Sequence, residues 1–112
     1  MISISLGLDR PLRTVLQRGD LFGLNILSKQ DGALVKPFSR SDVATPFKGL
    51  SLVENQFGIP LIAESWAFLV CKPEGSMPAG DHVLFLARVL DGALQKDKQE
   101  AMIRVRQNGF TY

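Results

Sequence analysis

The stretch GDHVLFLARVL (residues 80–90) decides the fold class of this chain. From residue 82 on it is apolar at nearly every position, and it begins with a turn-forming Gly-Asp pair. A short apolar run bounded by a turn is typical of a strand that is buried on both faces. Residues 65–71, SWAFLVC, have the same character. We therefore predict strands over residues 65–71 and 82–90, joined by a loop, KPEGSMPAGD, over residues 72–81.

The N-terminal residues predict a strand, a short helix and a second strand. Residues 2–8 alternate large apolar side chains with Ser and Gly, which is the period of a strand with one buried face. Asp9 can cap a helix over residues 10–18, in which Pro11 suits the first turn. Residues 21–27, LFGLNIL, form the next predicted strand.

The remaining elements are predicted to be shorter. Ser28, with Asp31 three residues later, can cap one turn of helix up to residue 35, which Pro37 then ends. The pair Asp91-Gly92 is a hairpin signal. Short strands are predicted over residues 50–53, 93–95 and 103–106.

Together these elements indicate one mainly β domain over residues 1–112. A chain of 112 residues falls in the size range of a single domain. The connections are too short to hold a crossover helix between each pair of the roughly six strands. We therefore expect an antiparallel β-barrel with one or two short helices.

The composition excludes several classes of function. Thirteen basic and eleven acidic residues leave a net charge of +2 and alternate along the chain, which indicates neither a nucleic-acid nor a membrane partner. One cysteine and one histidine cannot supply the ligands of a typical zinc site. Neither a Gly-x-Ser-x-Gly elbow nor a glycine-rich phosphate loop is present.

The single cysteine and the N-terminal residues indicate the cellular compartment of the protein. Cys71 lies in an apolar run, so we predict a buried structural thiol rather than a nucleophile. Residues 1–10 lack the basic and apolar segments of an export signal. We therefore expect a cytoplasmic protein.

Four short strings, in this order along the chain, resemble the flavin reductase-like, FMN-binding split-barrel family. They are FGLNIL (residues 22–27), GIPLIAESWAFLVC (residues 58–71), GDH (residues 80–82) before an apolar strand, and RQNGFTY (residues 106–112). Lys36-Pro37-Phe38 and the last of these strings are most similar to the C-terminal flavin reductase domain of cyanobacterial flavodiiron proteins.

The resemblance implies a split β-barrel that binds FMN, but only part of the family domain. Members begin with further strands, carrying a Thr/Ser-rich segment, before the strand that starts here at Ile2. By this comparison residues 1–112 are an N-terminally truncated domain, and FMN binding by the chain is left open. The implied activity is that of an NAD(P)H:flavin oxidoreductase, in which the protein provides an apolar slot, hydrogen bonds and charge compensation for a phosphate.

Three residues are candidates for holding the flavin phosphate. Arg10, Arg13 and Thr14 lie where the first strand enters the first helix, and guanidinium groups there suit a phosphate. Asp9 adds a negative charge and Pro11 lacks an N–H, so a solvated helix face is an equal alternative.

The resemblance assigns three further residues to the site. His82 is expected beside the flavin or nicotinamide as the catalytic residue, acting by hydrogen bonding or positioning. Phe38 is expected to border the flavin ring and Tyr112 to close over it, local packing being the alternative for each. Trp66 is predicted to be a core residue of its strand.

Two functions from different classes remain open. The first is an FMN-binding flavin reductase that uses NAD(P)H and acts as a homodimer. The second is a non-catalytic split-barrel remnant that serves as a dimerisation or interaction module.

Overall fold

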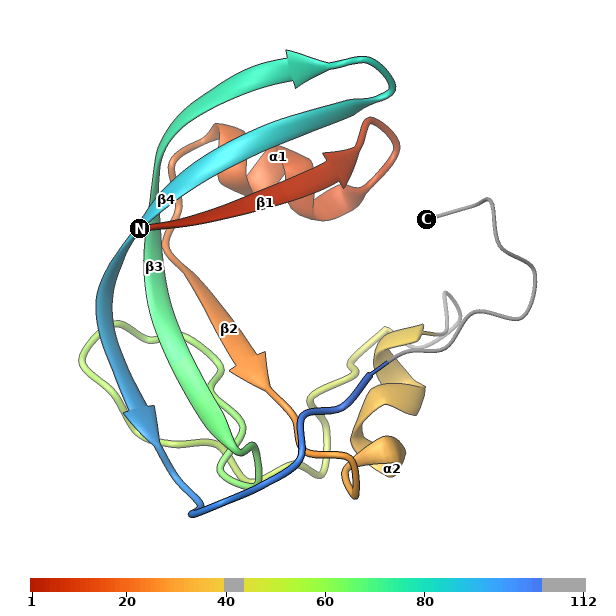
Figure 1. Ribbon diagram of the computed structural model, residues 1–112, viewed down its shortest axis with the longest axis vertical. Coiled ribbons are helices and arrows are strands. Elements are labelled where there is room, and N and C mark those ends of the chain that lie inside the picture. The colour runs from red at the N-terminus through yellow and green to blue at the C-terminus, as the bar shows by residue number, and fades with distance from the viewer. Residues whose placement is uncertain (40–43, 104–112) are drawn as a thin grey trace.

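The structure is a computed structural model that describes residues 1–39 and 44–103. Figure 1 shows the elements in space. In chain order they are β1 (Ile2–Gly7), α1 (Pro11–Gln17), β2 (Phe22–Ile26), α2 (Gly32–Val35), the 3-10 helix η1 (Lys36–Ser39), β3 (Ala67–Ala79) and β4 (His82–Leu94).

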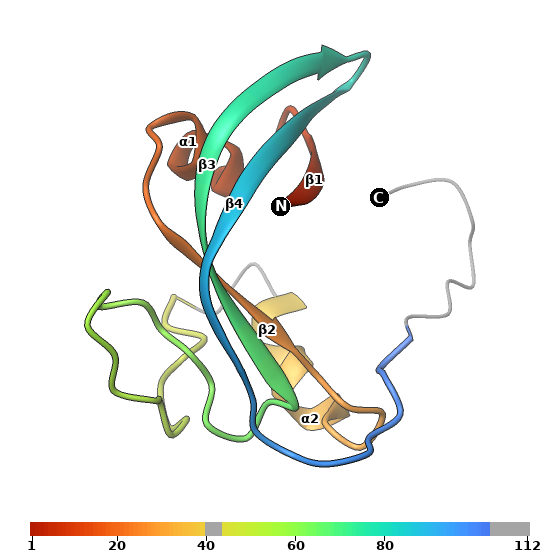
Figure 2. The same ribbon diagram turned by 60° about the vertical axis from the view of Figure 1, so that its left-hand side comes forward.

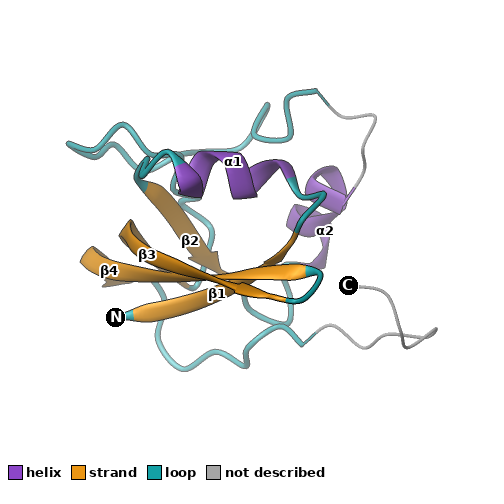
Figure 3. Cartoon of the chain, turned by 90° about the horizontal axis from the view of Figure 1, so that it is seen from above, coloured by secondary structure: helices purple, strands orange, loops and turns teal. Residues whose placement is uncertain are grey.

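The strands form one antiparallel sheet in the order β1-β4-β3-β2. Figures 1 and 2 show the long β3–β4 hairpin curling so that the sheet makes half of a barrel. Both short helices lie on the same side of this sheet (Figure 3). The predicted class, a mainly β split barrel with one or two short helices, is confirmed.

The first three elements agree with the sequence pattern to within a residue or two. Ile2, Ile4 and Leu6 pack on the core, while the intervening serines are exposed. The helix α1 has Pro11 in its first turn and buries Leu16. However, the residue that caps it is Arg10 and not Asp9, and no side chain completes the cap.

The predicted loop over residues 72–81 is wrong, because β3 continues through it to Ala79. Ala79 pairs with His82, so only Gly80 and Asp81 form the turn. Gly80 has a φ of 66°, the left-handed conformation that the first turn position of a type II′ hairpin requires. The strand tolerates Pro73 because the register shifts there and β2 pairs with β3 only up to Cys71.

The predicted hairpin at Asp91-Gly92 is also wrong. The strand β4 runs straight through this pair, with Gly92 opposite Leu69. A Cβ on Gly92 would stand 2.8 Å from Cδ2 of Leu69 and 3.0 Å from the carbonyl oxygen of Phe68. Glycine is needed here because the backbone of β3 comes close, and not because the chain turns. The predicted return strand over residues 93–95 is instead the last two residues of β4 and the residue after it.

The smaller predicted elements differ for local reasons. Asp31, not Ser28, precedes α2, and its carboxylate accepts hydrogen bonds of 2.8 Å from the backbone N–H and the hydroxyl of Ser28. Pro37 does not end the helical segment, since η1 continues through it. Residues 50–53 contribute only an isolated bridge between Leu52 and Ile62.

The last predicted strand, over residues 103–106, is not formed at Ile103, and residues 104–106 lie outside the described residues. Instead, the chain after β4 runs beside the end of β2. The N–H of Met102 donates to the carbonyl of Leu27 over 3.0 Å, and Ser28 forms a bridge with Ala101.

The core has two parts, one packed against α1 and the other against the loop before β3. One buried cluster contains Leu16, Phe22, Cys71, Phe85 and Ala87, and a second contains Leu61, Phe68 and Val70. The predicted burial of Cys71 is confirmed, and this burial raises the pKa of its thiol. The prediction for Trp66 needs correction, because it immediately precedes β3 and is half-buried. Among the described residues, no helix is long and apolar enough to cross a membrane.

Candidate functional site

A cavity of about 420 Å³ lies where the β1–α1 turn meets the β3–β4 hairpin. The turn and the hairpin are joined by a hydrogen bond of 3.2 Å from the N–H of Leu8 to the carbonyl of Asp81. Most of the wall is backbone or apolar side chain. The lining residues are Ser5, Leu6, Gly7, Arg10, Pro11, Leu12 and His82.

The imidazole of His82 forms one wall of this cavity and is nearly buried, with 11% of the side chain exposed. Its Nδ1 lies 2.8 Å from Oδ1 of Asp81, whose side chain is 93% exposed. The hydrogen bond with His82, and then the charge of the imidazole, lower the pKa of the Asp81 carboxyl. The ring therefore contacts the Asp81 carboxylate at Nδ1 and also lines the cavity.

Arg10 brings a positive charge to the same cavity. Its side chain is 56% exposed, and its Nε lies 4.0 Å from Oδ1 of Asp9. An ion pair of this length between exposed groups contributes little, so the guanidinium can turn toward an anionic ligand. The structure thus brings together two of the predicted site residues, Arg10 and His82.

Arg13 and Thr14 lie further along α1 and do not line this cavity. Thr14 is exposed. The Nε of Arg13 is buried, and no hydrogen-bond partner is found for it among the described residues. The helix itself has seven residues, so it adds little to an anion site.

Phe38 lines a different cavity, of about 320 Å³, between β2 and the α2–η1 segment. Its ring contacts that of Phe47 edge to face, with centroids 4.8 Å apart. The two cavities share no lining residue, and Figure 1 shows α1 and α2 at opposite ends of the sheet. Tyr112 lies outside the described residues.

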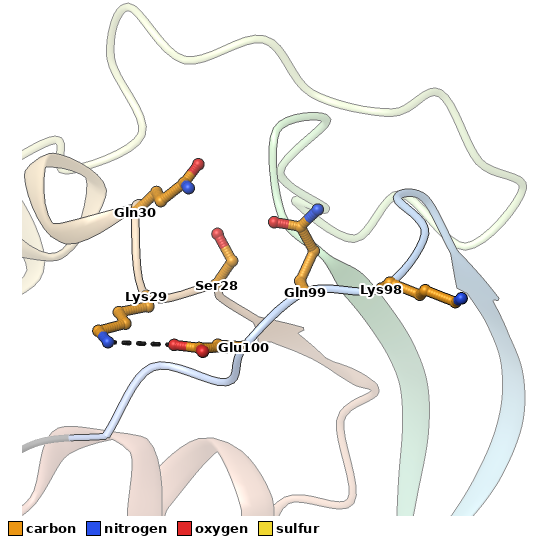
Figure 4. Close-up of a pocket in the computed structure, with 6 residues that line it drawn as sticks. All are labelled: Ser28, Lys29, Gln30, Lys98, Gln99 and Glu100. Atoms are coloured by element: carbon orange, nitrogen blue, oxygen red, sulfur yellow. Dashed lines mark hydrogen bonds and ion pairs between the residues drawn. The ribbon is translucent and has the colours of Figure 1, made fainter.

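A more polar cavity, of about 570 Å³, lies where the chain after β4 runs past the chain after β2 (Figure 4). It is lined by Ser28, Lys29, Gln30, Lys98, Gln99 and Glu100. Figure 4 shows Lys29 directed toward Glu100, and the two charges pair over 3.1 Å. Within the described part of the chain, no cluster of His, Cys, Asp or Glu could hold a metal ion.

Asn25 has a structural role that the sequence interpretation missed. Its Oδ1 accepts the N–H of Ile62 at 2.8 Å, and its Nδ2 donates to the carbonyl of Pro60 at 3.4 Å. These bonds attach the loop before β3 to β2. The sequence signal that could have predicted this role is a polar side chain between apolar residues of a strand. A polar side chain that is buried in this way needs a hydrogen-bond partner.

Residues 1–110 of the chain match the family described as Flavin reductase like domain. The chain belongs to this family. It is 26% identical over 116 residues to the putative diflavin flavoprotein A 6 of Nostoc sp. (strain PCC 7120), covering 99% of this chain and 20% of that protein. It is 30% identical over 121 residues to the putative diflavin flavoprotein A 3 of Synechocystis sp. (strain PCC 6803), covering 99% of this chain and 19% of that protein. The chain therefore spans about a fifth of the length of these relatives.

Solved structures of flavin reductases have the same fold as this flavin reductase-like domain. The NADH:FAD oxidoreductase SgcE6 of Streptomyces globisporus, in complex with NAD and FAD fragments, superposes with a TM-score of 0.79 at 22% identity, over 96% of this chain and 69% of that chain. The styrene monooxygenase flavin reductase of Pseudomonas putida S12 gives a TM-score of 0.68 at 27% identity, over 82% of this chain and 58% of that chain. The family resemblance seen in the short strings is thereby confirmed.

Proposed function

We propose that this flavin reductase-like domain binds FMN beside His82 and lets NAD(P)H reduce it. The observation that carries the proposal is the cavity in which Arg10 and His82 meet. Support comes from the family match and from relatives that are named as diflavin flavoproteins. It also comes from the likeness to an oxidoreductase solved with NAD and FAD fragments.

The residues present suit a flat aromatic group with an anionic tail. Leu6, Pro11 and Leu12 supply apolar wall, and Gly7 adds no side chain beside His82. Arg10 supplies one positive charge at the rim. Flavin and nicotinamide together supply the redox chemistry, in which a hydride passes from the dihydronicotinamide ring to the flavin ring.

The protein's part in this reaction is to bind and to orient. The guanidinium of Arg10 would compensate the phosphate charge, and the apolar wall would exclude water from the reacting face. The imidazole of His82 would orient a polar group of the nicotinamide or flavin by a hydrogen bond. No strong acid or base is required for hydride transfer itself.

We propose further that the domain works as a homodimer. The strands β1 and β2 are the two edges of the sheet, and large apolar side chains on the β3–β4 hairpin are exposed, including Met77, Leu86 and Leu94. A second copy that covers this surface would remove apolar area from water. Light scattering at micromolar concentration is expected to give twice the monomer mass, and a stable monomer would contradict it.

The test of flavin binding is a fluorescence titration of the purified chain with FMN. We expect saturable quenching, with His82→Ala and Arg10→Ala each shifting the curve to higher FMN concentration. A folded dimer that does not bind FMN would contradict this proposal and favour the alternative function, a non-catalytic interaction module.

A further inference from the structure

The strand β1 is an open edge of the sheet. Among the strands of the described chain it pairs with β4 only, and its register on β4 has no bulge (Figure 1). Edge strands are usually protected from pairing with another chain by a lysine, a proline or a bulge. The sequence of β1, ISISLG, contains neither lysine nor proline, so this edge has none of the three protections.

The backbone groups that point to this open edge belong to alternate residues. The N–H of Leu8 donates to the carbonyl of Asp81, in the turn before β4, over 3.2 Å. Successive residues of a strand direct their N–H and C=O groups to opposite sides within the sheet, so the even-numbered residues of β1 bond to β4. Ser3 and Ser5 therefore direct both their N–H and their C=O groups to the open edge.

The side chains of β1 suit a second copy of the same strand. Ile2, Ile4 and Leu6 pack on the core and are half-buried, whereas Ser3 and Ser5 are exposed on the opposite face. When two copies meet antiparallel about a two-fold axis perpendicular to the sheet, core-facing side chains lie opposite core-facing side chains. The strand carries no charged side chain, so its approach to a second copy meets no charge repulsion.

The position of this axis follows from Gly7. The carbonyl of Gly7 already accepts a hydrogen bond of 3.1 Å from the N–H that precedes α1, which makes it a poor acceptor for another strand. An axis at Ile4 avoids this carbonyl, because Ser3 then lies opposite Ser5 of the partner subunit and exchanges both hydrogen bonds with it. An axis at Ser5 would pair Ser3 with Gly7, and an axis at Ser3 would shorten the paired segment.

We propose that two copies of the chain pair through β1, antiparallel about Ile4, so that their four-stranded sheets join into one continuous sheet. The inference deepens the homodimer proposed above, on which it rests, by assigning the contact to one edge of the sheet and to one register. Ser5 and Gly7 also line the cavity of about 420 Å³, so the second strand runs beside the candidate site.

The first arm of the test changes the charge at the edge. Ser3→Lys combined with Ser5→Lys places like charges opposite each other, and we expect the Kd of the dimer to rise roughly tenfold. Ser3→Lys combined with Ser5→Glu is the matched control, because the same two positions then carry opposite charges across the axis, and the dimer should be kept. Sedimentation equilibrium without FMN measures both values, so the result does not depend on flavin binding.

The second arm uses the wild type and therefore does not depend on the folding of a variant. Amide hydrogen exchange is measured by NMR above and below the dimer Kd. We expect the N–H of Ser5 to be protected only above the Kd, because its partner is in the second copy. The N–H of Ile4, which bonds to β4, should be protected at both concentrations.

The outcomes separate this pairing from the homodimer itself. A wild type that stays monomeric at every concentration would overturn both proposals. A dimer that is unchanged by the two lysines, or in which the N–H of Ser5 exchanges rapidly, would overturn the β1 pairing and support a homodimer through another surface. Equal weakening by the like-charge and opposite-charge variants would overturn the register about Ile4.

Discussion

Gly7 lies directly opposite His82 in the β1–β4 ladder, and a Cβ on Gly7 would stand 3.9 Å from Nε2 of the imidazole. Because Gly7 has no side chain, no group projects from β1 into the part of the cavity beside the imidazole. At the same position, a Cβ would come within 3.0 Å of Oδ1 of Asp9, an exposed side chain that can move. If the cavity binds a ligand as proposed, the space at Gly7 should therefore matter more for binding than for packing of the core.

Substituting Gly7 by Val should weaken FMN binding with little loss of stability. The two methyl groups would enter the cavity beside His82, and we expect roughly a tenfold rise in the Kd for FMN, equivalent to ~1.4 kcal/mol. Fluorescence titration gives the Kd and urea unfolding gives the stability. Gly75→Val is the matched control, because Gly75 is a strand glycine with open space around it. Equal FMN affinity in wild type and Gly7→Val would place the flavin elsewhere.

Removing the charge of Arg10 should weaken FMN binding more than riboflavin binding. Because the side chain is more than half exposed, we expect a loss of about 1 kcal/mol, or roughly fivefold in Kd, for FMN. Riboflavin lacks the phosphate, so its affinity should not change. Arg18→Ala, at the other end of α1, serves as the control. An equal loss for both flavins would mean that Arg10 contacts the ring or shapes the cavity.

Gly92→Ala tests the reason why β4 passes straight through its Asp-Gly pair. The new Cβ would meet a backbone oxygen and a side chain at 3.0 Å and 2.8 Å, and the backbone oxygen cannot move aside cheaply. We expect the free energy of unfolding to fall by about 1–3 kcal/mol, the usual cost of overpacking. Gly75→Ala, in open space, should be neutral or stabilising by up to ~1 kcal/mol. Similar effects at both positions would mean that the close approach at Gly92 does not matter.

A pH dependence is expected from the ion pair across the β3–β4 hairpin. The guanidinium of Arg88 binds both carboxylate oxygens of Glu74, one of them at 3.1 Å, and this lowers the pKa of the Glu74 carboxyl. A lowered carboxyl pKa in the folded state stabilises it above the unfolded pKa, and this contribution is lost as the pH falls through the folded pKa.

Glu74→Gln should therefore be less stable than wild type at pH 7, and the difference should shrink below about pH 4. Urea unfolding at several pH values measures it. In an Arg88→Met background the same substitution should have a much smaller pH-dependent effect, since the main partner is absent and only the weaker influence of Lys72 remains. A stability difference that stays constant with pH would show that the ion pair does not lower the pKa of the Glu74 carboxyl.

The sequence patterns predicted the elements that are regular and bury one face. Alternating residues gave β1, and the apolar run after Gly80 gave the start of β4, because burial on a face has a fixed period. The same reasoning failed where a glycine or proline lies inside a strand, because it interpreted these residues as turns. Pro73 sits in the part of β3 that extends past its pairing with β2, and Gly92 sits in β4 against a neighbouring backbone. Local sequence cannot distinguish these uses from a turn, since the deciding contact is with a distant strand.

The candidate site was predictable only in part, for a similar reason. Arg10 and His82 come together because the register of β1 on β4 aligns Gly7 with His82, which no local pattern reveals. Phe38 was linked to them by the family resemblance, but the structure places it in another cavity. Asp81 was quoted only as part of a motif, and its contact with the imidazole is seen only when the turn is built.

Anaerobic stopped-flow reduction of FMN by NADH tests the central claim most directly. We expect the flavin absorbance to disappear much faster with the protein than without it, to disappear more slowly with NADH deuterated at the transferred position of C4, and to be slowed by His82→Ala. Because most of the His82 side chain is buried, that variant is compared per folded molecule. Reduction at the same rate with and without the protein, at FMN concentrations that saturate the binding curve, would contradict the account.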